Sequence, residues 1–147
     1  MNLEAILALW QDDSVLNPTN LASESLKTPS LHHKYLTILT HERMNYHRID
    51  GELKRLKTEK MQWFDEGDSE ETRELGWVFP RNRGGKIHKP DQITYLEADP
   101  DYQKLMIKLL IQKEKITALE SIINSINNRQ WQIRNAVEYL KFTQGMI

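Results

Sequence analysis

Residues 102–140 read YQKLMIKLLIQKEKITALESIINSINNRQWQIRNAVEYL and contain neither glycine nor proline. Apolar side chains, with two glutamines among them, recur in alternating steps of three and four residues. That spacing places them on one narrow stripe of an α-helix, as in helices that pack lengthwise against one another. The stretch therefore predicts an all-α protein. The stripe consists of Tyr102, Leu105, Leu109, Gln112, Ile116, Leu119, Ile123, Ile126, Gln130, Ile133, Val137 and Leu140.

The helix that carries this stripe is expected to cover residues 101–144. Asp99 and Asp101 are candidate N-caps around Pro100, and Gly145 stands just after the last turn, where glycine is favoured. At 1.5 Å per residue the helix would span about 60 Å, against a radius of gyration of about 15 Å for a compact chain of this size. We therefore expect part of the stripe to be buried against other copies of the chain.

The second half of the stripe supplies the expected oligomerisation contacts. The polar Gln112 and Gln130 either set the register between helices, as polar seam residues do in coiled coils, or are tolerated at the boundary of the seam. Both readings stay open on the sequence. The residues expected in the interface between copies are Ile116, Leu119, Ile123, Ile126, Ile133, Val137 and Leu140.

A second helix is expected upstream, over residues 31–64. Its apolar or long side chains keep the same alternating spacing, and Glu42 occupies the one missing step. This helix therefore carries a narrow seam as well. The seam consists of Tyr35, Leu39, Tyr46, Ile49, Leu53, Leu56, Lys60 and Trp63.

The remaining segments are expected to be short or irregular. Residues 3–10 are amphipathic, and a Ser-, Thr- and Asn-rich stretch without regular structure is expected after them. Between the helices, an acidic linker precedes a turn-rich stretch that predicts short strands or an extended arm. The chain is thus predicted to be a single domain, residues 1–147, with an N-terminal segment (1–30), a basic helix (31–64), a linker and basic arm (65–100) and a long oligomerisation helix (101–144).

The net charge of −1 hides blocks of opposite sign along the chain. Residues 31–64 hold seven Lys and Arg against four Asp and Glu, and residues 77–91 hold four against one. Residues 65–76, between them, hold one basic residue against six acidic ones. A local basic surface can attract a polyanion even when the overall charge is close to zero.

Several classes of protein are excluded or disfavoured. The chain has no cysteine, so it can form neither a disulfide nor a Cys-ligated zinc site, and a reducing intracellular compartment fits best. Gly84-Gly85-Lys86 lacks the first glycine and the Ser or Thr of a phosphate-binding loop. The five histidines form no HExxH and no i, i+4 pair. We expect no enzyme activity, no cofactor and no metal.

The sequence also gives no indication of a membrane partner. The N-terminus lacks the basic start and the cleavage site of a secretion signal, and no apolar window approaches the roughly 18 residues of a membrane span. We therefore expect a soluble protein with no sign of export.

The basic helix ends in the run L53-K-R-L-K-T-E-K-M-Q-W-F64. Lysines attract phosphates of any sequence, and aromatic rings stack on unpaired bases for about 1–3 kcal/mol each. This combination suits single-stranded nucleic acid. The alternative is that Trp63 closes the apolar seam and the lysines form a solvated face. The candidate DNA contacts in the run are Lys54, Lys57, Lys60, Trp63 and Phe64.

Other basic residues fall into two groups. Arg48 and Arg55 have glutamates at helical spacing, Glu52 and Glu59, and are expected to pair with them. The loop after the acidic linker carries four more cations, which either add to DNA binding or pair with the linker. These candidate contacts are Arg81, Arg83, Lys86 and Lys89.

The layout resembles the UvsY-type recombination mediator family of T4-like tailed phages, and the resemblance runs almost from end to end. The segments that carry it are the M-N-L-E start, the basic helix ending in adjacent aromatics, L26-K-T-P-S-L-H-H-K-Y-L36, Y95-L-E-A-D-P-D101 and I123-N-S-I-N-N-R-Q-W-Q-I-R-N-A-V-E-Y-L-K-F-T-Q-G145. Together these segments are specific, although none of them would be specific alone.

The resemblance implies a non-enzymatic protein that forms a helical ring of six or seven copies and binds single-stranded DNA. It also implies that the protein helps a RecA-like phage recombinase to displace the phage single-strand-binding protein, in the cytoplasm of the infected bacterium. The family's contact motif is a lysine, any residue, an arginine, two residues and an aromatic pair. Anchored on Trp63 and Phe64, it places Lys60 at the arginine and Thr58 at the lysine, so the first cation is missing, with Lys57 one step away.

Two other functions stay open on the sequence alone. One is a structural or adaptor phage protein built on the same helices without DNA binding. The other is a transcription accessory factor that binds nucleic acid. Binding of single-stranded DNA would argue against the first, and preference for a specific duplex would argue for the second.

Overall fold

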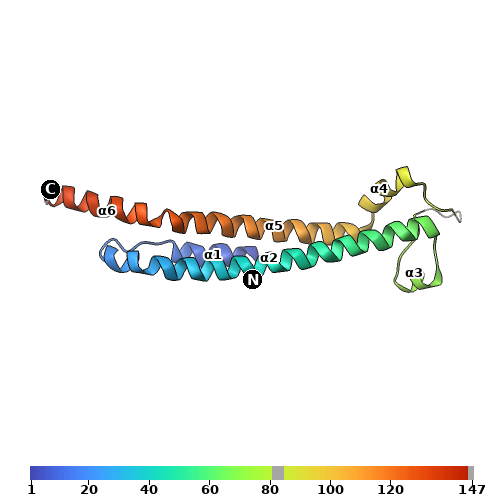
Figure 1. The fold of residues 1–147 in the computed structure, drawn as a ribbon, viewed down its shortest axis with the longest axis horizontal. Helices are drawn as coiled ribbons and strands as arrows, with labels where there is room; N and C mark the ends of the chain where they lie inside the picture. Colours follow the sequence, from blue (N-terminus) through green and yellow to red (C-terminus); the bar gives the residue numbers. More distant parts are fainter. Residues whose placement is uncertain (81–84, 146–147) are drawn as a thin grey trace. The chain divides into compact units, whose positions relative to one another are not determined.

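The computed structural model describes residues 1–80 and 85–145, which are helical apart from the connections (Figure 1). No strand occurs in these two ranges, so the predicted all-α class is confirmed and the expected short strands are not found there. None of the helices in the described part of the chain is long and apolar enough to cross a membrane. The helices are α1 (Leu3–Asp13), α2 (Leu21–Glu66), α3 (Glu70–Glu74), α4 (Lys89–Glu97), α5 (Pro100–Asn127) and α6 (Arg129–Thr143).

α2 begins ten residues before the predicted start, so the expectation of irregular structure over residues 21–30 was wrong. Asn20 caps the helix, because its side-chain oxygen accepts from the Ser23 N–H at 3.3 Å and its carbonyl from the Glu24 N–H at 3.1 Å. Pro29 lies inside the helix. The Ser, Thr and Asn residues of this stretch thus lie at the start of a helix, although their abundance suggested irregular structure.

The C-terminal helix begins and ends as predicted but is divided. The Asp99 carboxylate accepts from the Tyr102 N–H at 3.0 Å and caps α5, and Gly145 has a φ of +68° after α6. Asn128 separates α5 from α6, so residues 101–144 form two helices and not one.

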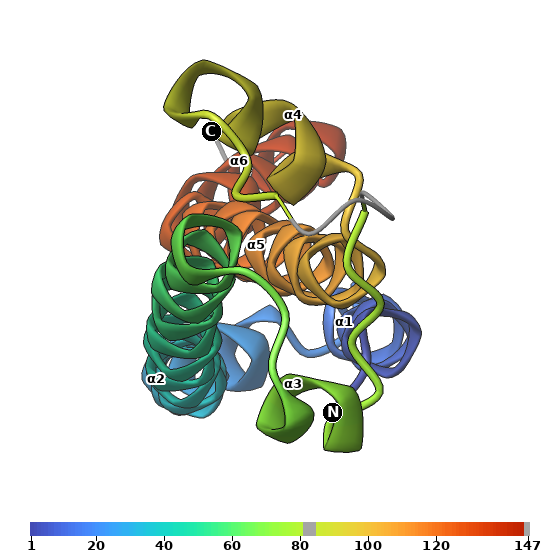
Figure 2. The same cartoon turned by 90° about the vertical axis from the view of Figure 1, so that its right-hand side faces the viewer.

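The segment predicted as linker and arm contains two short helices. α3 starts with a capping box, in which the Ser69 hydroxyl accepts from the Thr72 N–H and the Thr72 hydroxyl from the Ser69 N–H. α4 begins with Lys89 and Pro90, a residue suited to a first helical turn. Both lie near the C-terminal end of α2, on either side of it (Figures 1 and 2).

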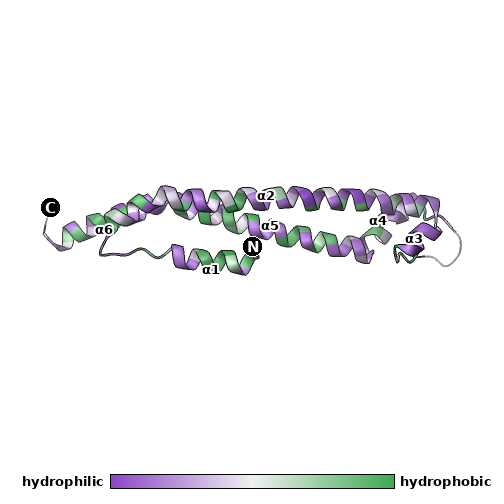
Figure 3. Cartoon of the chain, turned by 90° about the horizontal axis from the view of Figure 1, so that it is seen from below, coloured by the Kyte–Doolittle hydropathy of each residue, from purple (hydrophilic) through white to green (hydrophobic). Residues whose placement is uncertain are grey.

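The helices group into two compact units. Unit 1 comprises Met1–Asn45 and Gln112–Ile147, and unit 2 comprises Tyr46–Ile111. Within unit 1, α1 lies beside the N-terminal part of α2 and the C-terminal part of α5 and packs against both (Figure 2). Apolar and polar positions alternate along these helices (Figure 3), and the apolar ones meet in one core. That core consists of Ile6, Tyr35, Leu39, Leu119, Ile122 and Ile126.

The predicted seam of the C-terminal helix drifts by one position. Ile122 and Arg129 are buried where the stripe predicted Ile123 and Gln130. A straight α-helix turns through about 20° less per heptad than a strict 3.5-residue repeat, so its buried face moves along the stripe. Gln130 is exposed and accepts from the Ser25 hydroxyl at 3.3 Å, as expected of a boundary residue.

This packing corrects part of the oligomerisation assignment. Leu119, Ile126 and Ile133 are buried in the chain itself, so they are not free to contact other copies. Ile116 and Ile123 are half-buried against the same core. Val137, also half-buried, and Leu140, 36% exposed, are the assigned residues least used by the chain's own packing.

Two polar residues of the predicted seams, Glu42 and Gln112, meet inside unit 1. The Gln112 amide donates to the carboxylate of Glu42 at 2.5 Å and to its backbone carbonyl at 2.8 Å. Lys115 lies 3.7 Å from the same carboxylate. Gln112 thus fixes the register of α5 on α2 within one chain, and a shift of one helix along the other would leave Glu42 buried without its donors.

Buried carboxylates should make unit 1 sensitive to acid. Hydrogen bonds from Arg129 and then Lys27 lower the pKa of Glu24. Burial acts to raise the pKa of Glu42, but the Gln112 hydrogen bond and the Lys115 charge outweigh it and leave that pKa lowered. A carboxylate whose pKa is lowered by folding adds stability above its unfolded value of about 4.5 and loses it as pH falls. We expect the thermal midpoint to fall between pH 5 and pH 3.

The Glu24→Gln variant checks this assignment in the same pH series. It removes one of the titrating groups, so its midpoint should fall less steeply than that of the parent. Glu114→Gln, at an exposed position of α5, should keep the parental slope. Equal slopes for all three proteins would contradict the prediction.

Candidate nucleic-acid interface

The aromatic pair at the end of the basic helix lies in the core of unit 2. Trp63 is 4% exposed and Phe64 is 0% exposed. The Trp63 ring packs against Trp77 and Phe79, with centroids 5.2 Å and 5.1 Å apart. The structure therefore corrects the assignment of Trp63 and Phe64 as surface contacts: neither ring has a face available for a base.

Lys60 is buried beside this aromatic cluster. Its side chain is 1% exposed, and its Nζ lies 3.1 Å from Asp99 Oδ1 and 3.1 Å from Asp101 Oδ2. The same ammonium lies 3.7 Å from the centre of the Trp77 ring, a cation–π contact. Two carboxylates and an aromatic face thus occupy the positions that phosphates would need, so Lys60 is also corrected as a surface DNA contact.

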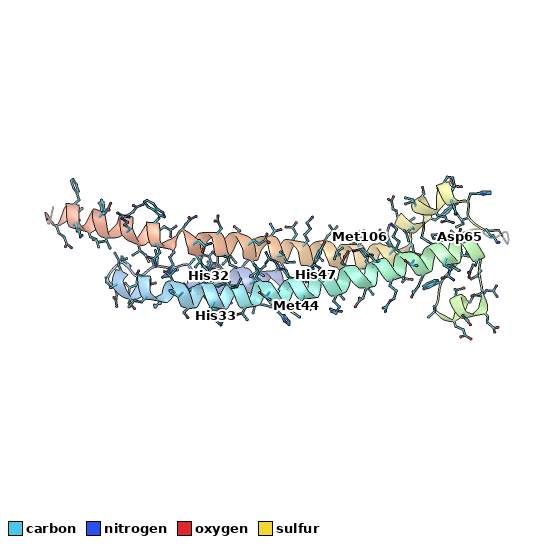
Figure 4. The ribbon with its side chains drawn as sticks, in the orientation of Figure 1. His32, His33, Met44, His47, Asp65 and Met106 are labelled. Atoms are coloured by element: carbon cyan, nitrogen blue, oxygen red, sulfur yellow. The ribbon has the colours of Figure 1, made fainter. Side chains whose placement is uncertain are left out.

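The start of α4 is fixed to the end of α2. The Ile87 N–H donates to the Phe64 carbonyl at 2.9 Å. The Gln92 amide donates to the Ile87 carbonyl at 3.0 Å and to the carboxylate of Asp65, labelled in Figure 4, at 2.6 Å. These bonds hold the segment that carries Lys86 and Lys89.

The predicted DNA contacts that remain on the surface differ in whether they form an ion pair with an acidic residue. Lys54 has a 76% exposed side chain and donates to Asp50 at 2.7 Å, a hydrogen bond that raises the pKa of the lysine. Lys57, Lys86 and Lys89 are exposed and form no ion pair with any residue that the structure describes. Lys86 and Lys89 therefore do not pair with the described acidic linker, and Arg81 and Arg83 lie outside the described residues.

Arg55 is a further exposed cation of α2. Arg48 pairs with Glu52 at 2.8 Å as expected, and Arg55 forms no ion pair in the described chain. The expected pairing of Arg55 was therefore wrong. Because Glu52 is engaged by the other arginine, Arg55 joins Lys57 as a candidate phosphate contact on the same helix.

Two cations of α5 were missed by the sequence analysis. Lys104 and Lys108 are exposed and unpaired within residues 1–80 and 85–145. No acidic residue stands three or four positions from Lys108 in the sequence. This absence could have identified Lys108 as an unpaired cation. Asp101 stands three positions before Lys104, but it contacts Lys60. The exposed, unpaired cations in the described part of unit 2 are Arg55, Lys57, Lys86, Lys89, Lys104 and Lys108.

These cations form the charged part of the candidate interface. The described residues hold no group of three or more His, Asp or Glu side chains suited to a metal ion. An array of exposed Lys and Arg can neutralise phosphates and release their counterions, irrespective of base sequence. The arrangement is therefore chemically suited to binding a polyanion.

Comparison with known proteins identifies the family. Residues 9–146 match the family model described as "Recombination, repair and ssDNA binding protein UvsY". The chain belongs to the UvsY family. This confirms the resemblance read from the sequence. No curated protein sequence is similar enough to the chain to count as a match.

Solved structures of the UvsY family share the fold. Crystal structures of the bacteriophage T4 recombination mediator protein UvsY match this chain in three lattice types. Lattice type II gives a TM-score of 0.79 at 20% identity, covering 98% of each chain. Type IV gives 0.78 at 17% identity, covering 97% of this chain and 99% of that one, and type I gives 0.78 at 18%, covering 95% and 98%. At this identity the likeness concerns the fold.

Replacing Lys60 with alanine should destabilise the protein. The change leaves the Asp99 carboxylate, 9% exposed, without its cation and opens a gap beside Trp77. Breaking a buried ion pair from one side costs about 3–5 kcal/mol. Denaturant titration should show a loss of this order, whereas Lys57→Ala, at an exposed position, should stay within about 0.5 kcal/mol of the parent. Equal midpoints for Lys60→Ala and the parent would refute the structural role.

Proposed function

We propose that the chain is a non-enzymatic recombination mediator that binds single-stranded DNA. It promotes the loading of a RecA-like phage recombinase in place of the phage single-strand-binding protein, in the cytoplasm of the infected bacterium. The family description, which names recombination, repair and single-stranded DNA binding, supports this proposal. The observation that carries it is the set of exposed, unpaired cations in unit 2.

The proposed DNA contact is electrostatic. Lys54 and Lys57, with Arg55, face the strand from α2, and the other exposed cations of unit 2 extend the surface. We include Arg81 and Arg83 in the proposed DNA-binding surface because of their charge alone. Since Trp63 and Phe64 are buried, they contribute no stacking, and affinity depends mainly on phosphate neutralisation. Such binding is weakly dependent on base sequence, as a protein that coats arbitrary strands requires.

We propose a ring of six or seven copies as the working form. One copy offers few phosphate contacts, but a ring raises the effective concentration of the remaining sites once one is engaged. Val137 and Leu140 of α6 contribute to the contact between copies. An exposed helix of about 15 residues is marginal in water, so α6 gains stability by packing against a neighbour.

This arrangement explains how a protein without catalytic groups could exchange one DNA-bound protein for another. A strand bound at many points around a ring is held in an extended or bent path. That path disfavours the single-strand-binding protein, which needs the same phosphates, and presents the strand to the recombinase.

Replacing Arg55 and Lys57 with glutamine should weaken binding to every single-stranded oligonucleotide tested. Each phosphate contact removed lowers the slope of log K against log salt by about 0.7 for single strands, so the slope should fall by about 1.4 per protomer that engages both side chains. Binding measured across a salt series, with particle mass determined for each variant, checks this result.

Arg73→Gln is the matched control. It also removes a cation from unit 2, but one already paired with Asp68 at 2.8 Å. Its slope should equal that of the parent. An intact Arg55/Lys57 variant with unchanged affinity and slope would remove this surface from DNA binding. No binding to single strands would favour the adaptor protein, and preference for a specific duplex would favour the transcription factor.

Replacing Val137 and Leu140 with glutamate should dissociate the oligomer without unfolding the chain. Both side chains are partly solvated in the isolated chain, so charge is tolerated there until another copy buries it. Native mass spectrometry should report a shift to smaller species, and the helical circular dichroism should persist. Ile126→Glu, in the core of unit 1, should instead unfold the protein. An unchanged particle mass in the double variant would exclude these residues from the interface.

A further inference from the structure

An apolar cleft lies at the junction of α4 and α5 in unit 2. It measures about 590 Å³ and is lined by Glu97, Tyr102, Gln103, Met106 and Ile107. Met106 is labelled on α5 in Figure 4. Leu110 and Ile111 extend the apolar surface along the helix and are 54% and 53% exposed. Isolated exposed apolar residues are common, but a cleft continued by such residues is typical of an interaction site.

A complementary surface lies on α6 in unit 1. Trp131, Tyr139 and Phe142 are 65%, 68% and 73% exposed. At about 100° per residue they share the side of the helix opposite the buried Ile133. Lys141, beside Phe142, is exposed and has no ion-pair partner among the residues that the structure describes. The aromatic side chains thus form one exposed face of α6, and Lys141 lies at the edge of that face, about 100° around the helix from Phe142.

The cleft belongs to unit 2 and α6 to unit 1. Met106 lies 22 residues before Asn128, and Phe142 lies 14 residues after it. A contact between two copies of the chain would bring together one surface from each.

We propose that the aromatic face of α6 docks into the cleft at the start of α5 of the next copy. Phe142 enters the cleft between Tyr102 and Met106, and Lys141 then lies beside Glu97, the acidic residue in the cleft lining. The docking joins an aromatic surface bordered by Lys141 to an apolar cleft that contains Glu97, so their charges are complementary. The inference rests on the proposed oligomer and identifies the surface that receives α6.

The proposed contact determines the symmetry of the assembly. The two surfaces differ, so the interface is heterologous, and its repetition forms a ring when the rotation from copy to copy closes. An isologous contact between identical faces would stop at a dimer. Val137 and Leu140 lie on another side of α6, which leaves them free to pack against a different neighbouring helix.

The absence of native cysteine allows a direct crosslinking test. Phe142→Cys and Met106→Cys proteins are prepared separately, mixed, allowed to exchange subunits and oxidised gently. We expect disulfide-linked dimers in the mixture and few in either protein alone. The double variant, with both changes in one chain, should give a ladder of linked species up to the full ring. Leu75→Cys, 67% exposed in unit 2, replaces Met106→Cys as the matched control and should give no link above background.

The other outcomes overturn the proposal in distinguishable ways. An intact oligomer that links Phe142→Cys only to itself would show that α6 packs against α6, and the cleft would have a different occupant. Equal linking to the Leu75→Cys control would indicate random collision. A monomeric parent in native mass spectrometry would refute the ring itself, and with it this docking.

A charge exchange provides a second measurement without cysteine. Lys141→Glu should weaken association by about two- to fivefold, the range of an exposed ion pair, and Glu97→Lys combined with it should restore the parental value. Lys113→Glu, which reverses an exposed charge elsewhere on α5, is the control for net charge. Failure of the combined variant to recover would refute the pairing of Lys141 with Glu97.

Discussion

The burial of a single ammonium group, on Lys60, organises unit 2. A charged amine removed from water needs nearby carboxylates, and Asp99 and Asp101 supply them at the junction of α4 and α5. Asp99 also caps α5, and the aromatic face over the amine belongs to Trp77, in the connection after α3. One buried charge therefore ties the end of α2 to three later parts of the chain.

How far the sequence could predict this arrangement depends on the kind of interaction. Helix class, the cap at Asp99 and the glycine at 145 follow from local spacing and backbone preference, and all three were predicted correctly. Lys60 stands four residues after Leu56 on the predicted seam, which already indicated a buried position. Its partners stand about forty residues further along, and no local pattern identifies a carboxylate at that distance. Lys60 was therefore predicted to contact DNA because it lies among other cations in the sequence, and its position on the helix seam was not given enough weight.

The same reasoning explains which DNA contacts had to be reassigned. Cations near aromatic residues in sequence suggested one surface, but an α-helix turns about 100° per residue and sends them to different sides. The side that holds Lys60 and Trp63 faces the core, whereas Lys54 and Arg55 face solvent. Lys104 and Lys108 come from a helix far away in sequence, so only the fold assigns them to the same unit. The exposed cations therefore offer positive charge to a nucleic acid, whereas the buried aromatic rings offer no surface for stacking.

The drift of the C-terminal seam connects the fold to assembly. A stripe with strict heptad spacing cannot stay on one side of a straight helix, so a single partner cannot cover its whole length. In this chain α1 and α2 cover the part that contains Leu119 and Ile126, and the stripe becomes progressively exposed toward Leu140. The part that the chain leaves uncovered is the part that we propose to contact other copies, so one periodic stretch closes the core of unit 1 and leaves an apolar edge beyond it. Asn128 does not mark the boundary between these two parts, because Arg129 and Ile133 of α6 are still buried in unit 1. The uncovered part of the stripe begins at Val137.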